Sequence, residues 1–301
     1  IDSSKTKFDI FCIFHIQGGR SQGCSYTPNS QSGIGASMSW DEVLGRVSFT
    51  NCDPIFHGLE DKWKILPAPP SWLTGHVLRR DCLTAPIPTA DYAEHSEELD
   101  LIPGLGIVSA GNVGSVLLFG SRPLESMRDI ALPSDSSTSK VLLRWVLNGR
   151  GMNCKFVELG PDIDAMLSNC DGALLIGDRA LAAARAYPGL VRLDLGYEWT
   201  AQTGLPMVFG VFAARKDSPE NSLRKAHSDM LEQYKLFLSD ADWKLRVVKS
   251  SAKKLGFPES RVSQYFDNEV RNYLDADAIM GLEAFLMDVC GMKETPTWFQ
   301  P

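Results

Sequence analysis

The sequence predicts a two-lobed α/β protein, and three observations support this prediction. The chain has 301 residues, which corresponds to two domains or one two-lobed unit at about 100–200 residues per domain. Strand-like and helix-like segments alternate from residue 44 to about residue 213, which is typical of parallel sheets covered by helices. From residue 217 onward the apolar pattern is helical. A chain that crosses between two lobes twice and ends in helices on the first lobe fits this order.

The elements follow from local composition. Expected strands cover residues 45–50, 107–110, 115–120, 129–132, 173–176 and 208–214, and expected helices cover residues 139–147 and 178–186. Ser218-Pro219-Glu220 predicts a helix start, with Ser218 as N-cap and Pro219 in the first turn. Further helices are expected near residues 241–255, 259–267 and 275–290. We expect lobe 1 to comprise residues 41–113 and 209–301, and lobe 2 residues 114–208.

The first forty residues differ from the rest. Residues 17–39 are rich in Ser, Gly and Gln and show neither helical nor alternating periodicity. The first methionine, Met38, begins a start-like run that leads into the first expected strand. We therefore expect residues 1–40 to be a flexible N-terminal extension.

Composition and charge exclude several classes of protein. Hydrophobic residues make up 44% and charged residues 22%, as in ordinary globular proteins. The net charge of −7 leaves no basic excess to neutralise phosphates, so no nucleic-acid partner is expected. No apolar run approaches the roughly 20 residues of a membrane-spanning helix, so no membrane partner is expected either. The 7 cysteines are scattered without a C-x-x-C pair, which indicates reduced thiols in a cytoplasmic protein.

Asn51 follows the first expected strand directly. In open α/β sheets, ligands bind outside the carboxyl ends of strands. The simpler interpretation is that Asn51 caps the helix that follows. The two interpretations are compatible, because a side chain at that edge can cap a helix and contact a ligand.

A run of hydroxyl residues precedes the helix expected at residues 139–147. It reads Ser134-Asp135-Ser136-Ser137-Thr138-Ser139, and its 5 hydroxyls lie at a helix N-terminus, where free N–H groups and the dipole favour an anion. Capping needs only one of them, so an anion site and plain capping both stay open. A second strand–turn–helix junction carries Gly177-Asp178, and there Asp178 is most simply an N-cap.

Nucleotide and metal sites are not indicated. Gly104-Leu105-Gly106 lacks the third glycine of a dinucleotide fingerprint, and a strand rather than a helix follows it. The glycines at 111 and 114 indicate close backbone approach at a crossover instead. His57, His76, His95 and His227 show no ligand spacing. We therefore expect no cofactor and no metal.

In order and spacing, the segments together resemble the chorismate dehydratase family of the futalosine route to menaquinone. The matching pieces are residues 45–54, 114–119, 136–139, 171–178, 194–196 with Trp199, 203–209, Tyr265-Phe266 with Tyr273, and 281–283. In the sister enzyme, 1,4-dihydroxy-6-naphthoate synthase, the turn that corresponds to Gly177-Asp178 looks like His-Glu, so the glycine favours the dehydratase branch. The chain departs from the family pattern at Ser137, where an arginine is usual.

The resemblance implies a type 2 periplasmic-binding-protein-like fold with a ligand cleft between the lobes. It also implies a cofactor-free lyase that removes water from chorismate and gives 3-(1-carboxyvinyloxy)benzoate. Asn51 and Ser115 would be the catalytic residues, which orient the substrate and its departing hydroxyl. The substrate-binding residues would be Ser136, Thr138, Ser139, Gly177 and Asp178. The base would be the enolpyruvyl carboxylate of chorismate itself.

Two other functions fit the same fold. A non-catalytic binding protein would clamp a small carboxylate and do no chemistry, since fold does not fix function. A dehydratase-like sensor with a decayed site is the other, supported by Ser137 at the arginine position. The sequence makes no prediction of the oligomeric state.

Overall fold

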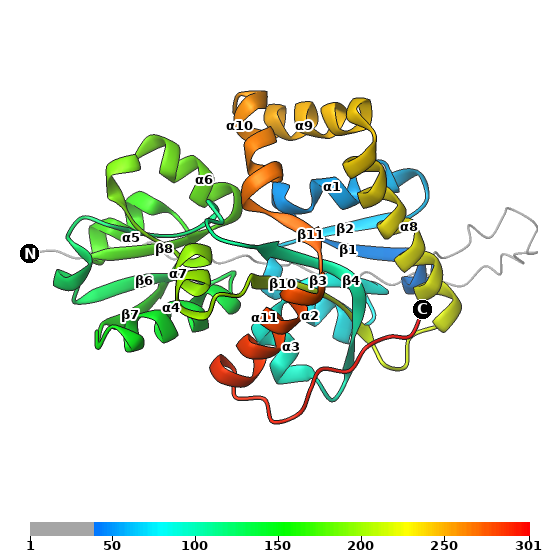
Figure 1. Ribbon diagram of the computed structural model, residues 1–301, viewed down its shortest axis with the longest axis horizontal. Coiled ribbons are helices and arrows are strands. Elements are labelled where there is room, and N and C mark those ends of the chain that lie inside the picture. Colours follow the sequence, from blue (N-terminus) through cyan, green and yellow to red (C-terminus); the bar gives the residue numbers. More distant parts are fainter. Residues whose placement is uncertain (1–38) are drawn as a thin grey trace, which may run out of the picture. The chain divides into compact units, whose positions relative to one another are not determined.

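The structure, a computed structural model, describes residues 39–301 (Figure 1). The predicted N-terminal extension lies outside the described residues, apart from Ser39 and Trp40. The strands of the described part form a 6-stranded and a 5-stranded sheet. Helices pack on both, so the α/β prediction is confirmed.

The larger sheet collects strands from both ends of the described chain. Its order is β11-β4-β10-β3-β1-β2. The strands are β1 (Val43–Val47), β2 (Lys64–Ala68), β3 (Thr84–Pro88), β4 (Leu99–Ser109), β10 (Met207–Arg215) and β11 (Arg271–Tyr273). The helices that precede or follow them are α1 (Asp53–Phe56), α2 (Pro70–Leu78), α3 (Thr89–His95), α8 (Glu220–Ser239), α9 (Ala241–Leu255), α10 (Glu259–Gln264) and α11 (Ala276–Ala284).

The smaller sheet is built from the middle of the chain. Its order is β7-β6-β8-β5-β9. The strands are β5 (Val116–Gly120), β6 (Asp129–Pro133), β7 (Lys155–Leu159), β8 (Gly172–Ile176) and β9 (Val191–Asp194), and the helices are α4 (Thr138–Gly149), α5 (Ile163–Asn169), α6 (Gly177–Ala186) and α7 (Leu195–Thr203). Buried apolar side chains of both sheets join in one large core cluster, with a smaller cluster in this sheet.

The sheets are mixed, so the prediction of parallel sheets is wrong for part of each. β1 runs parallel to β2 and β3, but β10 runs antiparallel to β3 and β4. In the smaller sheet β5 runs antiparallel to β8 and β9. Both reversed strands follow a passage of the chain from one sheet to the other. Strand direction depends on where the chain enters a sheet, and local apolar periodicity does not record this.

The sequence predicts only helices after residue 217, but this C-terminal region also contains a strand. The 3-residue strand β11 pairs with β4 at the edge of the larger sheet. Ser218 does not cap α8, because Pro219 takes the N-cap position and no side chain caps that end. The helices expected to end near residues 267 and 290 finish in π-helical turns, Tyr265–Glu269 and Phe285–Val289. The first of these turns brings Tyr265 into the protein interior.

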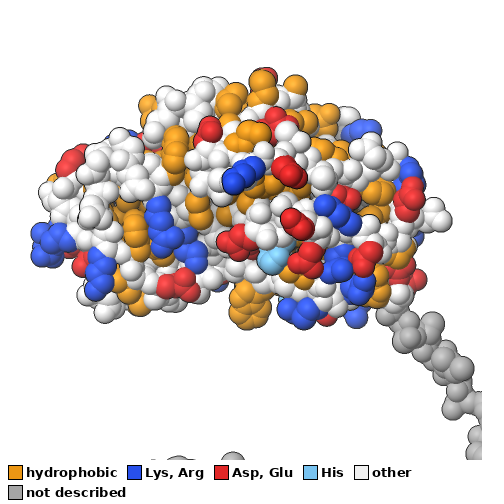
Figure 2. Space-filling view, turned by 90° about the horizontal axis from the view of Figure 1, so that it is seen from below, with side chains coloured by type: hydrophobic (Ala, Val, Ile, Leu, Met, Phe, Trp, Pro, Cys, Tyr) orange, Lys and Arg blue, Asp and Glu red, His pale blue; other side chains and the backbone are white. Residues whose placement is uncertain are grey.

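The surface carries mixed charge on the face that Figure 2 shows. Acidic and basic side chains alternate there with scattered hydrophobic ones, and neither sign covers a continuous area. This distribution agrees with the modest net charge of −7. No helix among residues 39–301 is long and apolar enough to cross a membrane.

Candidate active site

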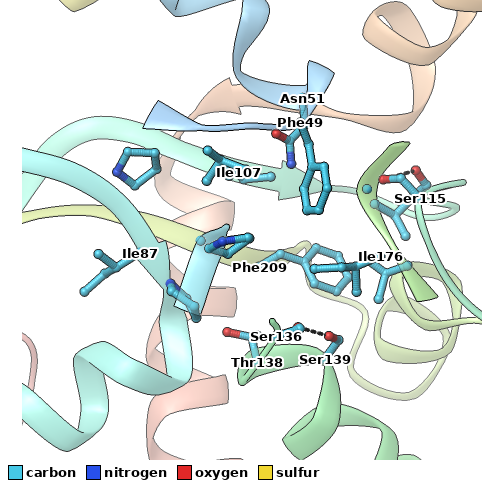
Figure 3. A pocket seen from close by; sticks show the side chains of 18 residues that line it. Phe49, Asn51, Ile87, Ile107, Ser115, Ser136, Thr138, Ser139, Ile176 and Phe209 are labelled. Carbon is cyan, nitrogen blue, oxygen red and sulfur yellow. Dashed lines mark hydrogen bonds between the residues drawn. The ribbon is translucent and has the colours of Figure 1, made fainter. Parts of the chain in front are cut away.

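A cavity is formed where the carboxyl ends of β1 and β8 meet the start of β5 (Figure 3). It holds about 540 Å³ of space free of protein atoms, part of which is open to solvent. Much of its lining is apolar, with Pro86, Pro88, Ile107 and Phe209 among the contributors. None of the 18 lining residues, all in the described part of the chain, is charged or a histidine.

Asn51 lies on the upper wall of this cavity in Figure 3. It belongs to a single 3-10 turn, Thr50–Cys52, between β1 and α1. The capping interpretation is wrong, because Cys52 precedes α1 and no side chain caps that helix. The Asn51 Oδ1 atom is buried without a hydrogen-bond partner in the described structure. Because buried polar atoms are nearly always paired, this amide is suited to a ligand or a water molecule.

The turn that carries Asn51 is held from two sides. The Asp178 carboxylate accepts hydrogen bonds from the Thr50 backbone N–H at 2.8 Å and from Thr50 Oγ1 at 3.1 Å. Asn272 Nδ2 donates to the Asn51 carbonyl oxygen at 3.1 Å. Asp178 therefore neither caps α6, which begins at Gly177, nor lines the cavity. Burial raises the pKa of Asp178, while the Thr50 N–H and Lys254, whose Nζ is 3.6 Å away, favour the charged form.

Gly177 is a glycine for two structural reasons. Its φ of +58° lies in the left-handed region, which side chains other than glycine rarely adopt. A Cβ atom there would lie 2.4 Å from the Phe49 ring, which also lines the cavity. The Gly177 N–H donates to the Ser115 carbonyl oxygen at 2.7 Å. The start of α6 is thus joined directly to the crossover that carries Ser115.

Ser115 is the last residue of the crossover, the segment 110–115 that connects β4 to β5, and it lines the cavity together with Gly177. Its hydroxyl lies 2.9 Å from the Tyr265 hydroxyl and 3.3 Å from the Val113 carbonyl oxygen. The backbone in front of it is clamped by Asp194, which accepts from Val113 N at 3.0 Å and from Gly114 N at 2.8 Å. Burial raises the pKa of Asp194, and these N–H groups oppose the rise.

The hydroxyl cluster consists of Ser136, Thr138 and Ser139, and it lies on the lower wall in Figure 3. Ser136 Oγ and Ser139 Oγ share one hydrogen bond. Thr138 Oγ1 accepts from the backbone N–H of Ala90 at 3.1 Å, which leaves its own proton free to donate. α4 begins at Thr138, so the first N–H groups of a 12-residue helix point to the same place. This wall therefore offers several neutral donors to an anion.

Ser137, which stands where the family usually has arginine, does not line the cavity. Burial raises the pKa of Asp91, and the hydroxyls of Ser137 and Thr74 oppose that rise by hydrogen bonding. The Arg179 guanidinium pairs with Asp135 and lies 5.5 Å from the centre of the Phe49 ring, which lines the cavity.

The structure therefore brings six of the seven predicted site residues to one cavity: Asn51, Ser115, Ser136, Thr138, Ser139 and Gly177. Asp178 does not line the cavity and instead binds Thr50, next to Asn51. Sequence reasoning gave no role to Tyr265, Asn272 or Asp194, although two of them lie in segments that carried the resemblance. Within residues 39–301, no group of three or more His, Cys, Asp or Glu side chains could hold a metal ion.

Comparison with known proteins agrees with this picture. Residues 43–289 match the model of a family described as menaquinone biosynthesis. The chorismate dehydratase of Thermus thermophilus is 28% identical over 278 residues, which covers 85% of this chain and 98% of the relative.

Solved structures of low sequence identity share the fold. A protein from Archaeoglobus fulgidus superposes with a TM-score of 0.67 at 16% identity, covering 83% of this chain and 97% of that one. The periplasmic aliphatic sulphonate binding protein SsuA of Escherichia coli gives 0.57 at 14% identity, covering 85% and 96%. A Candida albicans protein with the generic periplasmic binding protein fold gives 0.60 at 11% identity, covering 86% and 97%. Because the family model matches residues 43–289, which is most of the chain, the chain belongs to the menaquinone biosynthesis family.

Proposed function

We propose that this protein is a chorismate dehydratase, which converts chorismate to 3-(1-carboxyvinyloxy)benzoate and water without a cofactor. The observation that carries the proposal is the chemistry of the cavity wall. It offers uncharged hydrogen-bonding groups on two sides and no ionisable side chain among its 18 residues. Such a wall suits a reaction in which the substrate supplies its own base.

The reaction removes a proton from the ring carbon that bears the enolpyruvyl ether and a hydroxide from the neighbouring carbon. The electron pair of the broken C–H bond enters the ring, the C–O bond breaks, and the ring becomes aromatic. The enolpyruvyl carboxylate of the substrate takes the proton, and proton and hydroxide leave together as water. Aromatisation supplies the driving force, so the protein has to hold the reacting groups in line.

The two polar walls divide this task. The hydroxyl cluster and the start of α4 bind the ring carboxylate, toward which negative charge moves as the proton leaves. Asn51 and Ser115, on the other side of the cavity in Figure 3, then face the ether and the departing hydroxyl. Ser115 donates to that hydroxyl, and the Asn51 amide orients the enolpyruvyl group. Gly177 has no side chain, so the substrate can approach its backbone closely. Asp178 holds the turn that carries Asn51 by accepting the Thr50 N–H.

Residues 41–113 with 209–301 and residues 114–208 form the two lobes in this proposal, and they close on the substrate. Hydrogen bonds of Thr50 with Asp178 and of Ala90 with Thr138 join the two parts beside the cavity. The five cysteines in the described part are free, which supports a cytoplasmic location.

The test is incubation of the protein with chorismate, followed by mass spectrometry for a product lighter by one water molecule. We expect that product with the wild-type chain and its near absence with Asn51→Ala. Asn148→Ala, which changes an exposed asparagine on α4, is the matched control and should form product normally. If chorismate binds in calorimetry but no product forms, the protein is a carboxylate-binding protein and the proposal fails.

A further inference from the structure

We propose that Tyr265 is a positioning residue for catalysis, whose phenol donates a hydrogen bond to Ser115 and directs the Ser115 proton into the cavity. The inference rests on the proposed dehydration and names a residue that acts on it through Ser115. The two hydroxyl oxygens are 2.9 Å apart. Ser115 is 3% exposed and Tyr265 2% exposed, so water does not compete for this bond.

The direction of the hydrogen bond follows from the partners of each hydroxyl. Among residues 39–301, Ser115 is the only hydrogen-bond partner of the Tyr265 hydroxyl. If Ser115 were the donor, the buried phenol proton would have no acceptor among residues 39–301, which is unfavourable for a buried donor. Tyr265 therefore donates and Ser115 accepts.

The serine proton then has two places to go. The Val113 carbonyl oxygen is 3.3 Å away, which is long for an O–H···O hydrogen bond. The other direction is the cavity that Ser115 lines. A bound hydroxyl group at normal distance would be the better acceptor. A serine that already accepts one hydrogen bond is also the stronger donor, because hydrogen bonds in a chain polarise one another.

Tyr265 is itself held rigidly. It opens the π-helical turn Tyr265–Glu269, a rare conformation that is frequent at functional sites. The last residue of the turn, Glu269, pairs with Arg261 at 2.9 Å. Glu269 also packs against Gly114, where a Cβ atom would lie 2.1 Å from its Oε2 atom. The turn thus contacts the crossover at two neighbouring residues. Burial raises the pKa of Tyr265, so the phenol keeps its proton throughout the working pH range.

The test is a double-mutant cycle on chorismate turnover with Tyr265→Phe, Ser115→Ala and the double variant. Tyr265→Phe keeps the ring and removes the donor, so kcat should fall by about 10–100-fold, as expected for a misplaced group. KM should change by less than about threefold. In the Ser115→Ala background, Tyr265→Phe should have no further effect on kcat, because the residue acts through Ser115.

Tyr92→Phe is the matched control. Tyr92 is fully buried, and its hydroxyl accepts from the Thr297 backbone N–H at 2.9 Å, in a region that does not line the cavity. This variant should lose stability but keep kcat. Equal losses of kcat in Tyr92→Phe and Tyr265→Phe would show a general packing effect and overturn the proposal. So would a wild-type kcat in Tyr265→Phe, or losses that multiply in the double variant.

Two further outcomes have to be distinguished from these. If the wild-type chain forms no product, the proposed function fails before the cycle begins. If Tyr265→Phe does not fold, 3-fluorotyrosine at position 265 replaces it, since this residue is a stronger donor of nearly the same shape. We then expect a changed kcat at an unchanged melting temperature. An unchanged kcat would overturn the role of Tyr265.

Discussion

The two polar walls of the cavity differ in how their side chains are held. On the first wall, Asn51 and Ser115 are supported by residues far away in the sequence, including Asp178, Asn272 and Tyr265. On the second, the hydroxyl cluster is supported mainly by its own helix and by one hydrogen bond within the cluster, with one further hydrogen bond from the Ala90 backbone N–H. Single groups that are tightly positioned suit a reaction step, and a set of redundant donors suits the binding of a carboxylate.

The strongest test of this comparison is Asn51→Ala on the first wall. If the amide strengthens its contact as charge moves, kcat should fall by about 10²–10³-fold, as for loss of one preorganised donor. Because Asn51 does not cap α1, the melting temperature should change little. Steady-state kinetics and thermal melts on the same preparation measure both quantities. A folded variant with wild-type kcat would remove Asn51 from the catalytic residues.

The second wall should respond differently. Thr138→Val keeps the shape of the side chain but removes its hydroxyl, and Ser139→Ala removes a second one. If these donors bind ground state and transition state alike, each variant should raise KM by about 5–10-fold and leave kcat nearly unchanged. Ser134→Ala is the control, since this serine is exposed and does not line the cavity. A loss in kcat as large as that of Asn51→Ala would abolish the distinction between the walls.

Sequence reasoning reached the second wall more easily than the first. Ser136, Thr138 and Ser139 are neighbours at a helix start, so local pattern alone brings them together. The support of the first wall is not local. Asp178 stands where a helix cap is expected, yet it binds Thr50, 128 residues earlier. Tyr265 reaches Ser115 across 150 residues.

The same limit applies to the fold. Local periodicity predicts the strand type of β1, β5, β6, β8 and β10 and the helix type of α4 and α6, but it misses β2, β3, β7 and β9. The reversed directions of β5 and β10 depend on how the chain passes between the sheets. The 3-residue strand β11 forms only because the folded sheet offers a free edge, which the local sequence does not predict. Ser137 departs from the family pattern, and the hypothesis of a decayed site that this departure raises stays open, although Ser137 itself does not line the cavity.

The smallest expected effect is that of pH on kcat near neutrality. No residue that lines the cavity is ionisable. The carboxylates of chorismate have an ordinary pKa of roughly 3.5 and are therefore fully charged near neutral pH. We expect kcat to be constant from about pH 6 to pH 9. A protein histidine as base would instead give an acid limb with a pKa near 6.5. The buried His227 is bonded to the Pro103 carbonyl oxygen at 2.9 Å and does not line the cavity.

In acid, activity should fall before the fold is lost. Burial raises the pKa of Asp178 and of Asp194 above 3.8, so both lose their charge at a higher pH than an exposed aspartate does. Protonation weakens their hold on the backbone N–H groups beside Asn51 and Ser115. Protonation of these two carboxylates does not lower the folding stability, because a raised pKa means that the folded state favours the neutral carboxyl over the charged one. The stability that the neutral form contributes is present at low pH and is lost only as pH rises through the folded-state pKa. Measured together, kcat should therefore decline at a pH where the melting temperature is still maintained. A bell-shaped kcat profile with a pKa between about 6 and 8 would instead show that a protein group takes the proton, against the division of work between the two walls.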